Sequence, residues 1–110
     1  MIIITFFQVE LKEITIFYST LNSATTGTIT FPIIQKYVYS FVTVSEKEII
    51  DTLHYLWTRL KIVAEPSGAV SVAAVMHNKF PLKGKKIGAV ISGGNADVKK
   101  MAQLFSEVQD

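Results

Sequence analysis

Two short polar runs stand out in this chain of 110 residues as places where chemistry could occur. Residues 65–69 are Glu-Pro-Ser-Gly-Ala, and residues 92–95 are Ser-Gly-Gly-Asn. Each follows an apolar run and precedes a helical pattern, so we expect both turns at the carboxyl ends of strands, where helix N-termini favour acceptors and anions. A βαβ unit would bring these two turns close together. Two successive glycines let a flat ring or a backbone approach closely, because no β-carbon stands in the way. The Ser92 hydroxyl could donate to such a ring or accept from it.

Taken alone, each turn is a weak signal, because Gly-Gly after a strand more often marks a tight turn than a binding site. The order of the surrounding features is much more specific. A capped helix comes first, then Glu-Pro-Ser-Gly-Ala, an alanine-rich helix, an apolar strand and finally Ser-Gly-Gly-Asn.

The elements that would position these turns follow from local patterns. Ser45 and Glu48 have the spacing of a capping box and predict a helix that starts there and ends near Lys61. Its apolar residues form one stripe, made of Ile49, Ile50, Leu53, Leu56, Trp57 and Leu60. Pro66 suits the first turn of a second helix, which reaches Met76 and has so few polar residues that we expect it to be packed on several sides.

Strands are predicted on either side of this inner helix. Residues 62–64 form a short apolar run, and residues 87–91 form a continuous one, typical of a parallel strand buried on both faces. A last amphipathic helix carries Val98, Met101, Ala102, Phe105 and Val108, with Asn95 or Asp97 as its cap. The predicted fold class is therefore α/β, a three-layer βαβ arrangement with a partly parallel sheet and a right-handed crossover.

The first part of the chain gives less definite signals. Residues 2–18 suit two strands or one bent strand, and residues 19–30 suit a loop. A short helix is predicted from Pro32 to Tyr37, followed by a strand over residues 39–44.

Composition limits the class of protein. Hydrophobic residues make up 49% of the chain and charged residues 18%, which predicts one globular domain with apolar surface left over for an oligomer. The net charge of +2 is spread along the chain, so nucleic acid binding is not indicated. Lys83, Lys85 and Lys86 are interpreted as a solvated loop, and His54 and His77 as structural or surface residues.

Cysteine is absent and no residues form a metal-ligand cluster, so neither disulfides nor a metal site are expected. The apolar start of the chain is too short to span a bilayer and lacks the features of a signal peptide. We therefore expect a cytoplasmic protein with no membrane partner.

Three runs together resemble a known enzyme family. Residues 43–50 (Thr-Val-Ser-Glu-Lys-Glu-Ile-Ile), 64–69 (Ala-Glu-Pro-Ser-Gly-Ala) and 87–95, which end in Ser-Gly-Gly-Asn, resemble the fold-type II pyridoxal-phosphate enzymes, namely the threonine and serine dehydratases and serine racemases. Residues 26–34 (Thr-Gly-Thr-Ile-Thr-Phe-Pro-Ile-Ile) resemble the segment that precedes them there. The resemblance is to the C-terminal part of these enzymes and implies the tryptophan synthase β-like fold.

The resemblance covers roughly residues 24–107. It predicts a single domain, residues 1–110, in which residues 1–23 are divergent strands and residues 24–110 are the dehydratase-like part.

The resemblance also implies roles for the two turns. A serine placed like Ser92 hydrogen-bonds the pyridine nitrogen of pyridoxal 5′-phosphate, and a glutamate placed like Glu65 lies close to the same side of the ring. Such a neutral hydroxyl leaves the pyridine nitrogen largely unprotonated, which favours elimination of a β-hydroxyl group. The remaining predicted site residues are Gly93, Gly94 and Asn95, which would shape the pocket wall, and Gly68, which would permit the close turn beside Glu65.

Two parts of the family's site have no counterpart in this sequence. The Schiff-base lysine and the glycine-rich phosphate-binding turn belong to the amino-terminal part of those enzymes, and no segment here matches either. Lys85 and Lys86 lead into the strand at the end far from Ser92, and Lys99 and Lys100 lie in the last helix. We therefore expect no catalytic residue, weak binding of pyridoxal phosphate and no elimination by this chain alone.

Three functions stay open on these grounds. The chain is a fragment of a threonine dehydratase, which eliminates water and ammonia from hydroxy amino acids, and is inactive alone. Alternatively, it is a separately encoded subunit that completes a dehydratase with an amino-terminal partner, or a non-enzymatic α/β domain that dimerises through apolar faces.

Overall fold

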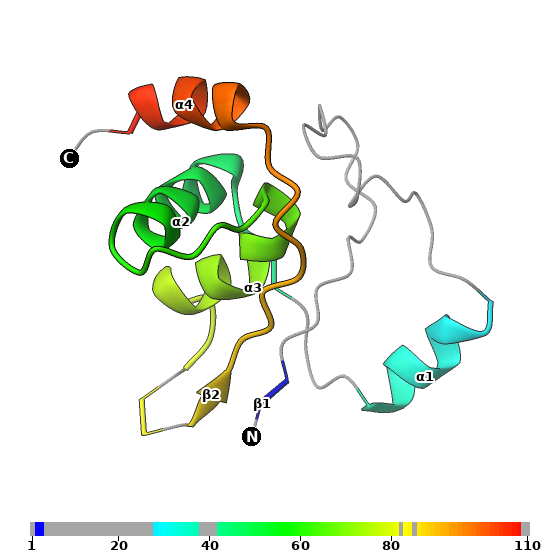
Figure 1. Ribbon diagram of the computed structural model, residues 1–110. Helices are drawn as coiled ribbons and strands as arrows, with labels where there is room; N and C mark the ends of the chain where they lie inside the picture. The colour runs from blue at the N-terminus through cyan, green and yellow to red at the C-terminus, as the bar shows by residue number, and fades with distance from the viewer. Residues whose placement is uncertain (1, 4–27, 38–41, 82, 85, 109–110) are drawn as a thin grey trace.

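The computed structural model describes residues 2–3, 28–37, 42–81, 83–84 and 86–108. Their elements, in order, are β1 (Ile2–Ile3), α1 (Thr30–Tyr37), α2 (Glu46–Thr58), α3 (Pro66–Met76), β2 (Ile87–Gly88) and α4 (Val98–Ser106). Helices α2, α3 and α4 gather into one body, the two short strands lie side by side at its edge, and α1 stands apart from it (Figure 1).

Helix α2 begins with the predicted capping box. The Ser45 hydroxyl accepts from the Glu48 backbone N–H at 3.3 Å, and the Glu48 carboxylate accepts from the Ser45 backbone N–H at 2.7 Å. The same carboxylate accepts from Lys79, whose Nζ lies 2.6 Å from Oε1. The hydrogen bond from Lys79, followed by that from the Ser45 backbone, lowers the pKa of Glu48 from 4.5 to about 2. This cluster ties the start of α2 to the chain just after α3.

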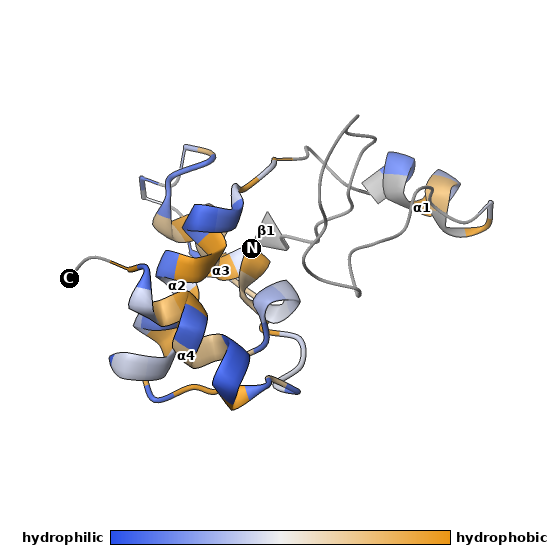
Figure 2. Ribbon diagram, turned by 90° about the horizontal axis from the view of Figure 1, so that it is seen from above, coloured by the Kyte–Doolittle hydropathy of each residue, from blue (hydrophilic) through white to orange (hydrophobic). Residues whose placement is uncertain are grey.

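Helix α3 is the inner helix that its composition predicts. Pro66 occupies its first turn, where the missing N–H costs no hydrogen bond, and small side chains line most of its surface. These side chains let α2 pack closely, and the two helices together form most of the core (Figure 2). The buried core cluster consists of Ile49, Leu53, Leu56, Ala64, Ala69, Val70, Ala73 and Met101.

Helix α4 lies on α2 and adds little to the core. The Asp97 carboxylate caps it by accepting from the backbone N–H groups of Lys99 and Lys100, as one of the two predicted alternatives requires. Of its residues, only Met101 is buried. Phe105 contacts the rings of His54 and Trp57 edge to face, with centroids 5.4 and 5.6 Å away. This contact gives His54 the structural role that we predicted.

The strand predictions on either side of α3 are largely wrong. Residues 62–64 form no strand, and of residues 87–91 only the first two do, pairing in parallel with β1 in the register Ile2 to Ile87 and Ile3 to Gly88. Val90 is 64% exposed, so the run is not buried on both faces. One carbonyl group in each run accepts a hydrogen bond from a side chain and not from a neighbouring strand. Trp57 Nε1 donates to the Ala64 carbonyl at 3.0 Å, and the Ser71 hydroxyl donates to the Val90 carbonyl at 2.6 Å. The described residues therefore form a mainly helical α/β body without the predicted βαβ unit.

Predictions for the first part of the chain have mixed outcomes. The short helix ending at Tyr37 is confirmed as α1, although it begins at Thr30 inside the predicted loop. The predicted strand over residues 39–44 is wrong for residues 42–44, which have no regular structure. Residues 4–27 and 38–41 lie outside the described residues, so most of the predicted N-terminal strands and loop do as well.

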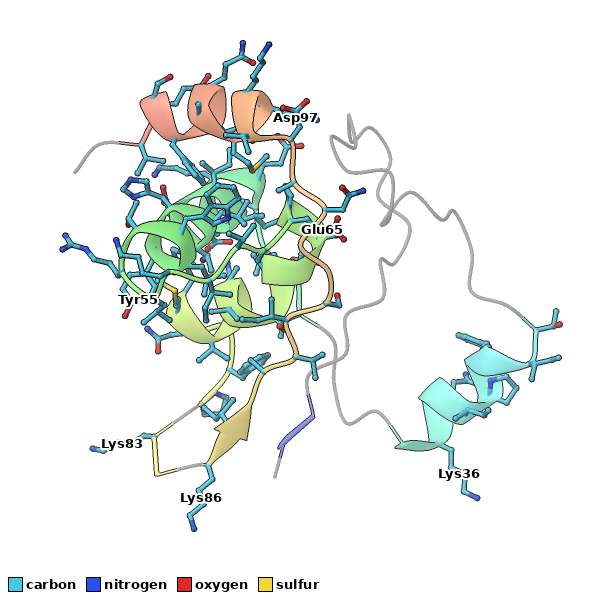
Figure 3. The ribbon with its side chains drawn as sticks, viewed as in Figure 1. Lys36, Tyr55, Glu65, Lys83, Lys86 and Asp97 are labelled. Carbon is cyan, nitrogen blue, oxygen red and sulfur yellow. The ribbon has the colours of Figure 1, made fainter. Side chains whose placement is uncertain are left out.

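The basic loop lies far from the two polar turns. Lys83 and Lys86 are exposed and point away from the helical body, as the prediction of a solvated loop requires (Figure 3). In the part of the chain that the structure describes, no helix has the length and apolar character needed to cross a bilayer.

Candidate functional site

The two polar turns meet in space. The backbone N–H of Glu65 donates to the Gly93 carbonyl at 3.3 Å. Gly68, in the first turn of α3, faces the second turn so closely that a β-carbon would collide with the Ser92 carbonyl oxygen. Figure 3 shows Glu65 beside the segment that runs from β2 to α4. The predicted proximity is therefore confirmed, and Gly68 is the residue that permits it.

The Glu65 carboxylate lies against the second turn. Its Oε1 accepts from the Ser67 hydroxyl at 3.0 Å. A β-carbon at Gly93 would lie 2.5 Å from the same oxygen, so the bare Cα of this glycine makes room for the carboxylate. Gly93 has a φ of +84°, a conformation that L-residues with a side chain rarely adopt. The positive φ is what favours glycine at this position, and the end of the flexible Glu65 side chain occupies the space that a β-carbon would fill.

The second glycine of the pair faces the protein as well. A β-carbon at Gly94 would lie 2.8 Å from the Val63 carbonyl oxygen. Ser92, Gly94 and Asn95 are exposed, so the Ser92 hydroxyl and the Asn95 amide are accessible to a ligand. The structure brings the predicted residues of both turns into one surface, while their roles toward a cofactor stay predictions.

Three supporting residues were not identified from the sequence. Trp57 donates to the carbonyl of Ala64, directly before Glu65, and Ser71 donates to the carbonyl of Val90, close to Ser92. Ser67 fixes the Glu65 carboxylate. A polar side chain inside an otherwise apolar helix was the available signal for Ser71, and its position within the Glu-Pro-Ser-Gly-Ala motif was the signal for Ser67.

The polar side chains of this surface can form hydrogen bonds to a ligand. Ser92 offers a neutral hydroxyl that can donate, and Glu65 offers a carboxylate whose second oxygen makes no hydrogen bond to a described residue. The Ser92 hydroxyl fits a ring nitrogen that is an acceptor, whereas the Glu65 carboxylate only accepts and fits a donor group of the same ligand. Among the described residues, no three His, Cys, Asp or Glu side chains gather where a metal ion could be held.

The chain is similar in sequence to several known enzymes. The chain is 47% identical over 81 residues to the L-threonine ammonia-lyase of Thermotoga maritima, covering 74% of this chain and 20% of that enzyme. It is 46% identical over 81 residues to the serine racemase of Schizosaccharomyces pombe, covering 74% and 25%. A biosynthetic L-threonine dehydratase of Staphylococcus aureus is 38% identical over 96 residues, covering 87% and 23%.

The chain thus spans about a fifth to a quarter of the length of the curated relatives that it matches. The family model described as pyridoxal-phosphate dependent enzyme matches residues 5–93, starting well before residue 24. The resemblance to the threonine and serine dehydratases is confirmed, and the chain belongs to the pyridoxal-phosphate dependent enzyme family.

Proposed function

We propose that this chain provides the pyridine-ring side of a dehydratase cofactor site and has no dehydratase activity by itself. One observation carries the proposal, namely that the Glu65 turn and the Ser92 turn form a single surface joined by the hydrogen bond from Glu65 to Gly93. The relatives named threonine ammonia-lyase, serine racemase and threonine dehydratase support the reaction class of the parent enzyme.

The residues of the two turns have distinct tasks in this proposal. Pyridoxal phosphate, when bound, supplies the electron sink for elimination. The Ser92 hydroxyl donates to the pyridine nitrogen and keeps it unprotonated, while Glu65 lies at the same side of the ring. Gly93, Gly94 and Asn95 shape the wall, and Gly68 keeps the two turns in contact.

Lack of activity follows from the residues that are missing. No segment of the chain matches the family's lysine or its glycine-rich phosphate-binding turn. Binding therefore depends on the ring contacts alone, which are few and partly exposed, so we expect weak affinity.

The experiment that tests this function uses 4-deoxypyridoxine 5′-phosphate, which cannot react with lysine. Its binding to the chain is measured by calorimetry for the wild type, Ser92→Ala and the control Ser106→Ala, whose exposed hydroxyl bonds the Gln103 carbonyl far from the turns. We expect weak binding that Ser92→Ala reduces and Ser106→Ala leaves unchanged. Equal affinities for all three proteins would contradict the role of Ser92.

Activity is tested separately with pyridoxal phosphate and threonine. We expect no ammonia release and, after borohydride reduction, no stoichiometric adduct at a single lysine. A stoichiometric adduct together with turnover would show that the chain is an enzyme in its own right.

Exposed valines beside the turns favour a second candidate function, a subunit that completes a dehydratase with a lysine-bearing partner. Val63 is 58% exposed, Val90 64% and Val98 68%, and these residues flank Glu65 and the run 92–95. Apolar surface at this position would be covered by a partner that closes the cofactor site.

Mixing the chain with the separately produced amino-terminal portion of a close relative tests this candidate. Restored threonine elimination that Val90→Asp abolishes would support it. A stable homodimer that gains neither activity nor pyridine binding would instead support the non-enzymatic dimerising domain.

A further inference from the structure

We propose that Ser67 is a positioning residue, which holds the Glu65 carboxylate so that one of its oxygens stays available to the ring at the Ser92 turn. This inference rests on the proposed function, because it concerns the orientation of a group in the same site. It goes beyond that function by assigning a task to a residue outside the set predicted from the sequence.

The first step is that one carboxylate oxygen is fixed. Ser67 Oγ donates to Glu65 Oε1 at 3.0 Å, and both side chains are partly buried. Gly93 lies next to the same oxygen, where a β-carbon would come within 2.5 Å. Oε1 therefore has a hydroxyl partner and also lies against the bare glycine.

The second step is that the other carboxylate oxygen has no hydrogen-bond partner among the described residues. Oε2 of Glu65 makes no hydrogen bond to any described residue, and the Glu65 side chain does not cap α3, although Glu65 is its N-cap residue. A carboxylate accepts at both oxygens, so Oε2 is the oxygen still open to a hydrogen-bond donor on the ligand, such as a ring hydroxyl and not the acceptor nitrogen.

The third step is that the backbone sets the location of this carboxylate while the hydroxyl sets its orientation. The Glu65 N–H is already held by the Gly93 carbonyl, so loss of the hydroxyl should leave the turns together. The side chain would then rotate more freely, and ordering it on binding would cost free energy.

Nuclear magnetic resonance of the ligand-free protein tests the contact directly. The ¹³C resonance of the Glu65 carboxyl group is compared in the wild type, Ser67→Ala and Ser67→Thr at neutral pH. We expect Ser67→Ala to shift this resonance and Ser67→Thr, which keeps the hydroxyl, to restore it. An unmoved resonance in Ser67→Ala would overturn the inference whatever the ligand does.

Titration with 4-deoxypyridoxine 5′-phosphate tests the consequence for binding. We expect Ser67→Ala to weaken binding by roughly tenfold, the order of the cost of ordering one freed side chain on binding, and Ser67→Thr to recover most of it. The three proteins should unfold at similar temperatures. If Ser67 only stabilised the fold, Ser67→Ala would instead lower the unfolding temperature.

The outcomes separate the two proposals. Wild-type binding with an unaltered affinity in Ser67→Ala would overturn the positioning role and leave the proposed function standing. A wild type that does not bind the compound would overturn the proposed function, and the positioning role with it.

Discussion

The backbone N–H of Glu65 donates to the carbonyl oxygen of Gly93, although the whole of α3 and β2 separates the two residues in the sequence. This hydrogen bond joins a helix N-terminus to a loop and leaves the Glu65 carboxylate beside the glycine pair. The contact depends on glycine at specific positions, and the first two predictions follow from that dependence.

Substitution Gly68→Ala should push the two turns apart. Its β-carbon would overlap the Ser92 carbonyl oxygen, a backbone atom that cannot move away alone. We expect a loss of about 1–3 kcal/mol in the free energy of unfolding, measured in urea, since overpacking of a close contact has costs of this order. Gly88→Ala is the matched control, because a β-carbon there meets nothing within 4 Å. Equal effects of the two substitutions would contradict the contact.

Substitution Gly93→Ala should destabilise the protein in two ways, and Gly84→Ala measures one of these two effects alone. Both glycines have positive φ, +84° and +74°, so each alanine pays about 1–2 kcal/mol for the left-handed conformation. Only at Gly93 does the β-carbon also meet the Glu65 carboxylate. Urea unfolding should therefore show a larger loss for Gly93→Ala. A loss equal to that of Gly84→Ala would contradict the second cost, because the end of the flexible Glu65 side chain would then have moved away freely.

Acid should weaken the connection between α2 and α3. The pKa of Glu48 is lowered to about 2 in the folded protein, from 4.5, chiefly by the hydrogen bond from Lys79. A lowered pKa stabilises the fold above pH 4.5, and this contribution is lost as the pH falls toward 2. The stability advantage of the wild type over Glu48→Gln should accordingly shrink over this interval. An advantage that is constant with pH would show that the ion pair contributes nothing.

Substitution Trp57→Phe should loosen the chain just before Glu65. Phenylalanine keeps a ring to pack against Phe105 but loses the N–H that donates to the buried Ala64 carbonyl. An unsatisfied buried acceptor costs about 1–3 kcal/mol, so urea unfolding should show a loss of that size. A loss below about 0.5 kcal/mol, the usual limit for surface substitutions, would indicate that water replaces the indole.

Local signals in the sequence predicted the helices well. The capping box needs only Ser45 and Glu48, three residues apart, and the small residues of α3 need only its own composition. Each pattern depends only on the residues of one helix and its cap, so contacts with the rest of the chain rarely change the outcome.

Strands could not be predicted in the same way. Whether residues 62–64 and 87–91 form strands depends on ladder partners elsewhere, and side chains of Trp57 and Ser71 bond the carbonyls of Ala64 and Val90 instead. The prediction that the two turns meet is confirmed, although the βαβ unit on which it depended is absent from the described residues. The bond from Ser67 to Glu65 depends on two side-chain conformations, which a sequence pattern does not specify.

The central claim is that the two turns together bind one pyridine ring. The most direct test follows backbone amide resonances of ¹⁵N-labelled chain during titration with 4-deoxypyridoxine 5′-phosphate. We expect the amides of Glu65, residues 67–69 and residues 92–95 to shift together, with a single dissociation constant, while those of α1 stay unchanged. Shifts confined to one turn, or centred elsewhere in the chain, would contradict it.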